Sequence, residues 1–312
     1  MSKRGWVIGI GIIVLTFLFL CLGSLALVLV VIGSSSGVPI GPKNNVAVIH
    51  IDGMIASSAE SGLLSGGTTS SPENVIGALR QAENDSRVAA VVLRVNSPGG
   101  SAAASQEIYT EVKRMKKPVV VSVADIGASG AYYISSAADE IMASPASEVG
   151  SIGVILTVVN LEELYSKFGI KYVTIKQGKY KDIGSADRPM TDEEKKMLEE
   201  MTSDIYEQFI SDVADARGLP KEQVRELATG MVWNGSQAKK LGLVDSLGNY
   251  RDAIKRAGKL GNIKGEPQVV TYGTPGLWDI LTGVTTAARV TGLAELLKLL
   301  GGTSSSQNLA TQ

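Results

Sequence analysis

VAAVVLRVNSPGGS, residues 88–101, begins with a run of eight residues that is apolar except for Arg94, and it closes with the tandem glycine Gly99-Gly100 and a serine. A continuous apolar run of this length predicts a strand buried on both faces, as the strands of parallel sheets are. A helical pattern begins directly afterwards and extends over residues 101–115. Strand, glycine turn and helix therefore follow one another without a linker, which is the repeating unit of α/β domains.

The same alternation continues on both sides of this stretch. Further strands are predicted at residues 46–51, 119–123 and 171–176, and further helices at residues 73–82 and 129–138. A long helix is predicted to begin at the capping box TDEE, residues 191–194, and to end at Gly218. The sequence therefore predicts an α/β domain with a largely parallel sheet.

The composition narrows the class of protein. With 312 residues, of which 44% are apolar and 20% charged, the chain can bury a full core. Its net charge of -1 gives no electrostatic attraction for nucleic acid, so no nucleic-acid partner is expected. The single cysteine, Cys21, excludes an intramolecular disulfide and a cysteine-based metal site.

The N-terminal region predicts a membrane anchor. Residues 6–32 contain no charged side chain and are long enough to cross a bilayer, which takes about 20 residues. A cleavable signal peptide is the alternative, as is a lipoprotein signal ending at Cys21, although Leu20 is bulky for the latter. Lys3 and Arg4 place residues 1–5 in the cytoplasm and the bulk of the chain outside it.

The remaining segments divide the chain further. Residues 33–44 are rich in Gly, Ser and Pro and are interpreted as a linker, which leads into a domain over residues 45–272. The extension over residues 273–312 has a helical apolar stripe followed by a polar tail. This stripe could pack on the domain, lie on the membrane surface or bind a neighbouring subunit.

GASGAYY, residues 127–133, places Ser129 between a predicted strand and a predicted helix. The serine is either a nucleophile or simply the N-cap of the helix. The only histidine, His50, lies in the apolar alternation of a strand and is an improbable base for it. Ala131 stands where the G-x-S-x-G elbow of the α/β-hydrolases has its second glycine, which argues against a histidine-dependent esterase.

Two other segments could complete a site around this serine. The Gly99-Gly100 turn could present backbone N–H groups to an oxyanion, or it could be a plain tight turn. A neutral lysine can serve as a general base, and Lys176, Lys179 and Lys181 lie close together after a predicted strand. Any of the three could instead be a solvated surface charge, and periodicity does not choose among them.

Four motifs in this order resemble a known family. They are NSPGG at residues 96–100, ASGAYY at 128–133, GSIGV at 150–154 and GKYKD at 178–182. Together they resemble the bacterial signal peptide peptidase A family, which comprises membrane-anchored Ser/Lys proteases. The fold of that family is similar to the crotonases and Clp protease and is built of repeated β-β-α units in a spiral. The resemblance covers about residues 45–255 and implies that residues 45–272 are a protease domain behind one transmembrane helix.

The resemblance also implies a role for each site residue. Ser129 matches the nucleophile, Lys181 the general base and Ser151 the serine that orients the lysine. Gly100 and Gly130 match the positions whose amides form the oxyanion hole. The family needs no metal or organic cofactor, so none is expected.

The expected partners follow from the same resemblance. Family members form rings, and in short members the serine and the lysine come from adjacent subunits, so a homo-oligomer with shared sites is expected. Substrates would be cleaved signal peptides and other exposed peptides at the outer face of the cytoplasmic membrane. Ala131, where many relatives carry glycine, is a departure that could narrow the space beside the nucleophile. The alternative function is a non-proteolytic, membrane-tethered binding or assembly module of the same fold, or an acyl-CoA binder like the crotonases.

Overall fold

A computed structural model describes residues 44–57 and 69–273. Its strands are β1 Asn45–Ile55, β2 Thr69–Ser70, β3 Val88–Gly100, β4 Val119–Ala128, β5 Glu140–Ala143, β6 Glu148–Gly150, β7 Val232–Asn234, β8 Ser246–Leu247 and β9 Gln268–Tyr272. Its helices are α2 Pro72–Asn84, α3 Ala102–Arg114, α4 Gly130–Ser136, α5 Glu162–Lys167, α6 Asp192–Arg217, α7 Lys221–Leu227, α8 Gly235–Lys240 and α9 Tyr250–Leu260.

The anchor predicted at residues 6–32 lies outside the described residues, as do nearly all of the linker and the C-terminal extension. Among the helices that the structure describes, none combines the length and the apolar character needed to cross a membrane.

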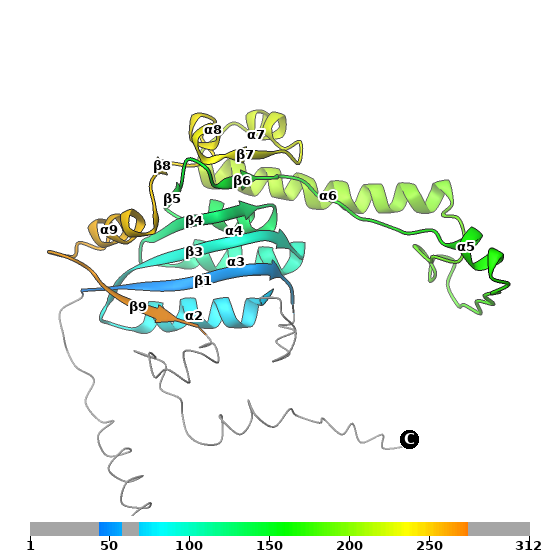
Figure 1. Cartoon of the computed structure of the whole chain (residues 1–312), viewed down its shortest axis with the longest axis horizontal. Coiled ribbons are helices and arrows are strands. Elements are labelled where there is room, and N and C mark those ends of the chain that lie inside the picture. The colour runs from blue at the N-terminus through cyan, green and yellow to red at the C-terminus, as the bar shows by residue number, and fades with distance from the viewer. Residues whose placement is uncertain (1–43, 58–68, 274–312) are drawn as a thin grey trace, which may run out of the picture. The chain divides into compact units, whose positions relative to one another are not determined.

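A mainly parallel sheet forms the centre of the domain (Figure 1). Its strands pair in the order β2-β1-β3-β4-β5-β8, and every pair along this path is parallel. Beyond the part of β4 that pairs with β5, the strand pairs with β6, which is joined by β7 in an antiparallel ladder. The end of β4 is therefore held from the side by a second small set of strands, and this is where Ser129 follows.

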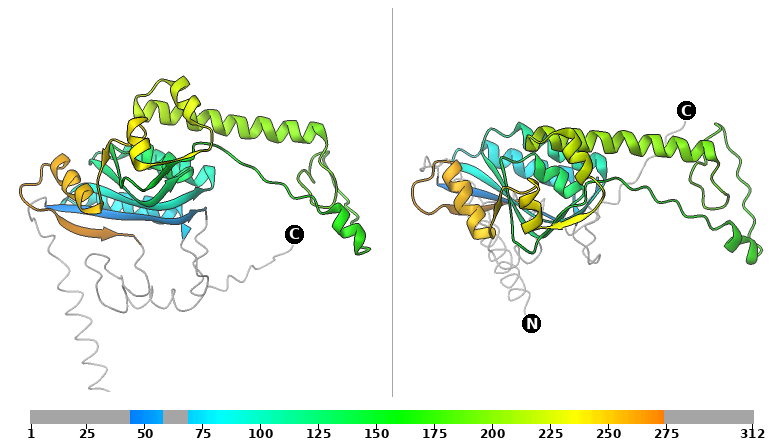
Figure 2. Two further views of the ribbon diagram at one scale, coloured as in Figure 1. Left: turned by 45° about the horizontal axis from the view of Figure 1, so that its top comes forward. Right: turned by 90° about the horizontal axis from the view of Figure 1, so that it is seen from above.

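The sheet is covered on both faces. Helices α2, α3 and α4 pack side by side on one face, and α9 packs on the other (Figure 2). Successive side chains of a strand point to opposite faces, so Leu93 of β3 joins the core under the three helices. Its neighbour Val92 joins the core against Ala253 and Ala257 of α9. The run that opens residues 88–101 is apolar apart from Arg94 because successive side chains are buried in two cores, one on each face of the sheet.

A long excursion leaves the domain between β6 and α6. We call residues 154–190 the arm. Its backbone and side chains bond to one another and to the first turn of α6, as in the hydrogen bond from the Leu161 N–H to the Ala186 carbonyl, 2.7 Å, and the ion pair between Lys179 and Glu193, 2.6 Å. Figure 1 shows the arm with α5 beyond the N-terminal end of α6, whereas the other end of α6 packs on the core through Phe209.

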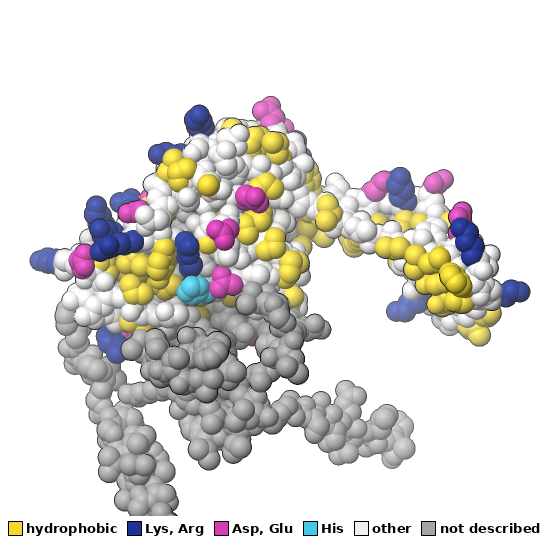
Figure 3. All heavy atoms as spheres, in the orientation of Figure 1, with side chains coloured by type: hydrophobic (Ala, Val, Ile, Leu, Met, Phe, Trp, Pro, Cys, Tyr) yellow, Lys and Arg dark blue, Asp and Glu magenta, His cyan; other side chains and the backbone are white. Residues whose placement is uncertain are grey.

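The arm exposes an unusual number of large apolar side chains. They are Ile155, Leu156, Val159, Leu164, Phe168, Ile170, Tyr172, Val173 and Ile175. Figure 3 shows the apolar side chains gathered there among charged ones. Ile155 and Ile175 are each 91% exposed, so these side chains have no core of their own within the described part of the chain.

Most predicted elements are confirmed, but the strand predicted at residues 171–176 is wrong. These residues have no regular structure and lie in the arm. Their apolar side chains suggested a buried strand, yet no neighbouring strand pairs with them in the described residues, and Val173 is 85% exposed. The apolar pattern belongs to an exposed surface instead.

The long helix begins and ends as predicted. The Thr191 hydroxyl accepts the Glu194 N–H at 3.2 Å, and the Glu194 carboxylate accepts the Thr191 N–H at 2.9 Å. Gly218 ends the helix in the left-handed conformation, with φ of 62°.

Candidate active site

Ser129 lies at the junction of β4 and α4 in a strained backbone conformation. Its φ is 53° and its ψ is -125°, a combination of backbone angles that residues other than glycine rarely adopt. Such a conformation costs about 1–3 kcal/mol and persists only where the surroundings enforce it. Here the Ser129 N–H donates to the Gly150 carbonyl of β6 at 2.8 Å, and its carbonyl accepts the Tyr133 N–H of α4 at 2.9 Å. Strand and helix together hold the serine in this geometry.

The same chain contains two ordinary serine caps for comparison. Ser71 and Ser101 precede α2 and α3, and their hydroxyls accept backbone N–H groups of the first turn at 3.4 and 3.3 Å. Both have negative φ values, -103° and -57°. Ser129 occupies the corresponding position before α4, but its hydroxyl makes no capping hydrogen bond. Capping therefore does not explain this serine.

The Gly99-Gly100 turn lies directly against Ser129. A Cβ built on Gly99 would stand 2.8 Å from the Ser129 Cβ and 2.7 Å from the Gly130 nitrogen. A Cβ built on Gly130 would stand 3.4 Å from the Gly100 nitrogen. Gly99 has φ of 99°, and its own N–H donates to Ser97 Oγ at 3.1 Å. The predicted turn is in fact the end of β3, where Gly99 and Gly100 pair with Met54 and Ile55 of β1. Only glycine allows this backbone to approach the serine so closely.

Ser151 lies next to Gly150, the residue that accepts the Ser129 N–H. It too has a positive φ, 51°, and its N–H donates to the Met231 carbonyl at 2.8 Å. Its hydroxyl donates to the Gly230 carbonyl at 3.2 Å. The structure thus brings together Ser129, Gly130, the glycine turn and Ser151.

Lys181 lies elsewhere in the same chain. It belongs to the arm, which bonds to α6 near Glu193, whereas α6 reaches the core at Phe209 beside Tyr133 of α4. The 16 residues from Glu193 to Phe209 span about 24 Å of helix at 1.5 Å per residue. Within one chain, therefore, the lysine does not meet the serine.

The three lysines of this region have different surroundings. Lys176 pairs with the Asp182 carboxylate and donates to the Lys179 carbonyl at 3.0 Å. Lys179 pairs with Glu193 at 2.6 Å, and the hydrogen bond to this carboxylate raises the pKa of Lys179. Lys181 is exposed, and its amino group contacts no partner among the described residues.

The contacts that fix α4 to α3 and α6 are not apparent from the sequence. The Tyr133 hydroxyl donates to the Asp212 carboxylate, and the Tyr133 ring stacks on Tyr109 at a centroid distance of 4.7 Å. Burial raises the pKa of Tyr133, and the Asp212 carboxylate raises it further, so the hydroxyl remains a donor. The sequence shows these residues only as parts of three separate helical patterns, and nothing in the local sequence pairs them.

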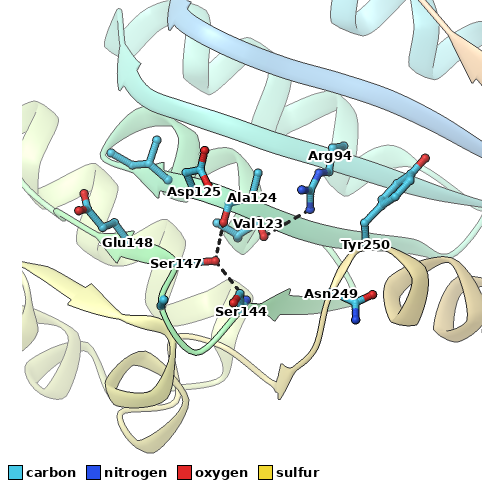
Figure 4. Close-up of a pocket in the computed structure, with 11 residues that line it drawn as sticks. Arg94, Val123, Ala124, Asp125, Ser144, Ser147, Glu148, Asn249 and Tyr250 are labelled. Atoms are coloured by element: carbon cyan, nitrogen blue, oxygen red, sulfur yellow. Dashed lines mark hydrogen bonds between the residues drawn. The ribbon is translucent and has the colours of Figure 1, made fainter.

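A separate cavity of about 480 Å³ lies beside Arg94 and the start of α9 (Figure 4). The Arg94 guanidinium donates to Ser122 Oγ at 2.8 Å and lies over the Tyr250 ring, 5.3 Å from its centroid. None of the predicted site residues lines this cavity. It is not part of the candidate site.

Two family models match the chain. Residues 111–264 match peptidase family S49, and residues 44–149 match Clp protease. The two matches overlap on the segment that contains Ser129, and together they cover residues 44–264.

Curated relatives agree with this match. A Methanocaldococcus jannaschii protein that is named as a protease is 45% identical over 64% of this chain and 64% of its own length. A Synechocystis protein that is also named as a protease is 41% identical over 71% of this chain and 76% of its own length. The chloroplastic serine protease SPPA of Arabidopsis thaliana is 33% identical over 83% of this chain, and the match covers 39% of that protein.

Among solved structures, a variant of a membrane-bound stomatin-specific protease is 16% identical, with a TM-score of 0.49 over 76% of this chain and all of the other.

The chain spans less than two thirds of the length of the Methanocaldococcus and Arabidopsis relatives. Its match to the Synechocystis protein covers more of that relative. The resemblance to signal peptide peptidase A is thus confirmed at the level of the family, and the chain belongs to peptidase family S49, a family of serine peptidases with a Clp-protease-like α/β fold.

Proposed function

We propose that this chain is a membrane-anchored serine endopeptidase with a Ser/Lys dyad. Ser129 is the nucleophile, Lys181 is the general base and Ser151 orients the lysine. The Gly100 and Gly130 amides form the oxyanion hole. The observation that carries the proposal is the strained, non-capping Ser129 packed against a glycine turn.

The chemistry is acyl transfer in two steps. The neutral Lys181 amine takes the Ser129 proton while Oγ forms a bond to the peptide carbonyl carbon. The carbonyl oxygen becomes an oxyanion and accepts hydrogen bonds from the two glycine amides. The C–N bond then breaks, and the lysine ammonium gives its proton to the leaving amine. Lys181 next deprotonates a water molecule, which cleaves the ester and regenerates the serine hydroxyl.

The surroundings of the three lysines favour Lys181 as the base. A general base must be neutral before it accepts a proton. Lys179 and Lys176 are each paired with a carboxylate, and the hydrogen bond to Glu193 raises the pKa of Lys179. Lys181 has no such partner among the described residues, and enclosure by another subunit would favour its neutral form.

The distance between serine and base favours a site shared between subunits. One chain holds Ser129 on its core and Lys181 on its arm, so a neighbouring copy must supply the second group. The exposed apolar side chains of the arm supply a surface that such a copy could bury. A homo-oligomer with composite sites accounts for both features.

Apolar peptides are the substrates that the surroundings favour. Met54 and Val232 pair in the sheet with Gly99 and Gly150, and Met231 bonds to Ser151, so all three lie near the site. Their side chains are 54%, 39% and 53% exposed, respectively. Remnants of signal peptides and other exposed peptides suit such a rim. The anchor at residues 6–32 would embed in membrane lipid and hold the protease domain, residues 45–272, at the outer face of the cytoplasmic membrane, with residues 273–312 as an extension.

The proposal predicts that Ser129→Ala abolishes peptide hydrolysis by the full-length protein. A fluorophosphonate probe should label the unmodified protein and fail to label this variant. Ser71→Ala is the matched control, since it removes an ordinary cap worth about 1 kcal/mol and should leave activity and labelling intact. A well-folded oligomer that neither hydrolyses peptides nor reacts with the probe would instead indicate a binding or assembly module.

The choice of base has its own test. Lys181→Ala should lower the rate of peptide hydrolysis about as far as Ser129→Ala does, because the two groups act as a unit. Lys179→Ala should keep most of the activity, since it removes only a solvent-exposed ion pair, which contributes little to stability. Equal losses in the two lysine variants would contradict the assignment.

A further inference from the structure

We propose that Arg188 is a positioning residue for Lys181, which it serves by fixing the neighbouring Asp182 to the N-terminal end of α6. The inference rests on the proposed function, because it assigns a role to the surroundings of the proposed base. Arg188 itself touches no reacting atom in this proposal.

The contacts of Arg188 connect two parts of the chain. Its Nε donates to Asp182 Oδ2 at 3.0 Å, and its Nη2 donates to Asp182 Oδ1 at 3.0 Å and to the Asp182 carbonyl at 3.3 Å. Its Nη1 donates to Glu194 Oε2 at 2.9 Å, and its Nη2 also donates to Glu194 Oε1. One guanidinium therefore holds the residue next to Lys181 and the first turn of α6 at the same time.

The Glu194 end of this connection is rigid. Glu194 is 3% exposed, and its carboxylate also accepts the Thr191 N–H of the capping box. The hydrogen bond from Arg188 lowers the pKa of Glu194 to about 2, so the carboxylate remains charged at neutral pH. Arg188 is thus anchored to a buried acid on a 26-residue helix.

The Asp182 end fixes the turn that carries Lys181. The Lys181 N–H donates to the Gly178 carbonyl at 3.3 Å, and the Ser185 N–H donates to the Asp182 carbonyl at 3.0 Å. These turn hydrogen bonds are local and set no direction relative to α6. Two sets of contacts to α6 supply that direction. Lys179 and Tyr180 bond to Glu193 just before the base, and Arg188 joins Asp182, the residue directly after it, to Glu194. Together they decide where the Lys181 amine is presented to a neighbouring subunit.

Arg188 also compensates the charge beside the base. The Asp182 carboxylate pairs with Arg188 and Lys176, and the hydrogen bond from Arg188 lowers the pKa of Asp182. Without Arg188, this carboxylate would be freer to pair with Lys181, and an opposite charge nearby favours the protonated amine. The same contact therefore orients Lys181 and keeps the Asp182 carboxylate paired with Arg188.

Lysine cannot replace this guanidinium. Arginine presents its donors in a planar fork, which matches two carboxylates and a carbonyl at once, whereas lysine carries a single ammonium on a flexible stem. Arg188→Lys keeps the charge and should still lose most of the function, as Arg188→Ala should. Lys195→Ala, at an exposed ion pair in the first turns of α6, is the matched control and should remain active.

Mixed oligomers test the proposal directly. Ser129→Ala and Lys181→Ala chains should be inactive alone and active when co-assembled, because about one quarter of randomly mixed sites receive an intact serine and an intact lysine from different chains. Arg188→Ala is then added to one chain of the pair at a time. In the Ser129→Ala chain, which supplies the lysine, it should lower the restored activity about 10- to 100-fold, as misplacement of a catalytic group does. In the Lys181→Ala chain it should have no effect.

The outcomes separate the possible failures. Equal losses in the two arrangements would show a general effect of Arg188 on folding or assembly and would overturn the positioning role. No loss in either arrangement would overturn it as well. If the parent pair does not complement at all, the shared Ser/Lys site is wrong, and the role of Arg188 is wrong with it.

Discussion

Ser129 differs from Ser71 and Ser101, which also precede helices, in its positive φ. Its strain is held by a hydrogen bond to Gly150 on one side and by the first turn of α4 on the other. The strained backbone therefore lowers the stability of the domain while it holds one hydroxyl that does not cap the following helix. A residue without a Cβ would adopt the same angles at lower cost.

This strain gives a measurable prediction. Ser129→Gly should unfold at higher denaturant concentration than Ser129→Ala, by about 1 kcal/mol in the free energy of unfolding, because glycine tolerates the positive φ of 53°. Both variants should be inactive, so the comparison separates stability from catalysis. Equal stability of the two variants would indicate that the backbone at this position is not strained in solution.

The individual site residues differ in how far the sequence could predict them. Local rules place Ser129 and the glycine pair Gly99-Gly100 where a strand ends and a helix begins, but they left a helix cap and a plain turn open as alternatives. Lys181 does not, because its distinction from Lys176 and Lys179 depends on which carboxylates fold back onto them. Asp182 lies nearby in sequence, but Glu193 comes from α6, and a pattern along the chain does not show that contact.

At the scale of elements, the strand of residues 88–95 and the helix α6 were predictable and the arm was not. The strand carries a continuous apolar run and is buried along it, although β3 continues to Gly100. The helix carries a periodic pattern with clear start and stop signals; it is buried at Phe209 and Val213 but exposes Met201 towards its N-terminal end. The arm carries an apolar pattern as well, yet it covers no core within the described residues. Sequence patterns identify surfaces that need covering and do not say which molecule covers them.

Helix α6 should make the stability of the domain sensitive to acid. Hydrogen bonds from Arg188 and Arg225 lower the pKa values of Glu194 and Glu207, each to about 2, below the usual value near 4.3. The folded state therefore binds fewer protons than the unfolded state in this range, so both contributions are complete above about pH 5 and are lost as the pH falls towards 2. Denaturant unfolding at a series of pH values should show the decline.

A matched pair of variants checks the origin of this effect. Glu207→Gln should weaken the dependence of the unfolding free energy on pH, since it removes one of the carboxylates whose pKa is lowered in the folded state. Glu199→Gln, at an exposed pair with Lys195, should leave the dependence as it is. An unchanged slope in the Glu207 variant would assign the acid sensitivity to other residues.

At the scale of the whole molecule, the arm predicts that assembly and activity change together. Ile175→Asp places a charge on a side chain that is 91% exposed, so the fold of the single chain should tolerate it. A charge within an apolar interface is costly, so the oligomer should dissociate and peptide hydrolysis should fall with it. Light scattering of the full-length protein in detergent, with Lys195→Asp as the control, measures the first effect. Unchanged mass together with unchanged activity would contradict the role of the arm.

The separation of Ser129 from Lys181 along one chain has a consequence for the cell that makes the protein. Under the proposed shared Ser/Lys site, a newly synthesised copy would carry its nucleophile and its base out of reach of each other, so it would be latent without a propeptide or an inhibitor. Activity would then rise with the local density of copies, and confinement to a surface would raise that density. Proteolysis would be switched on by arrival at the place of assembly.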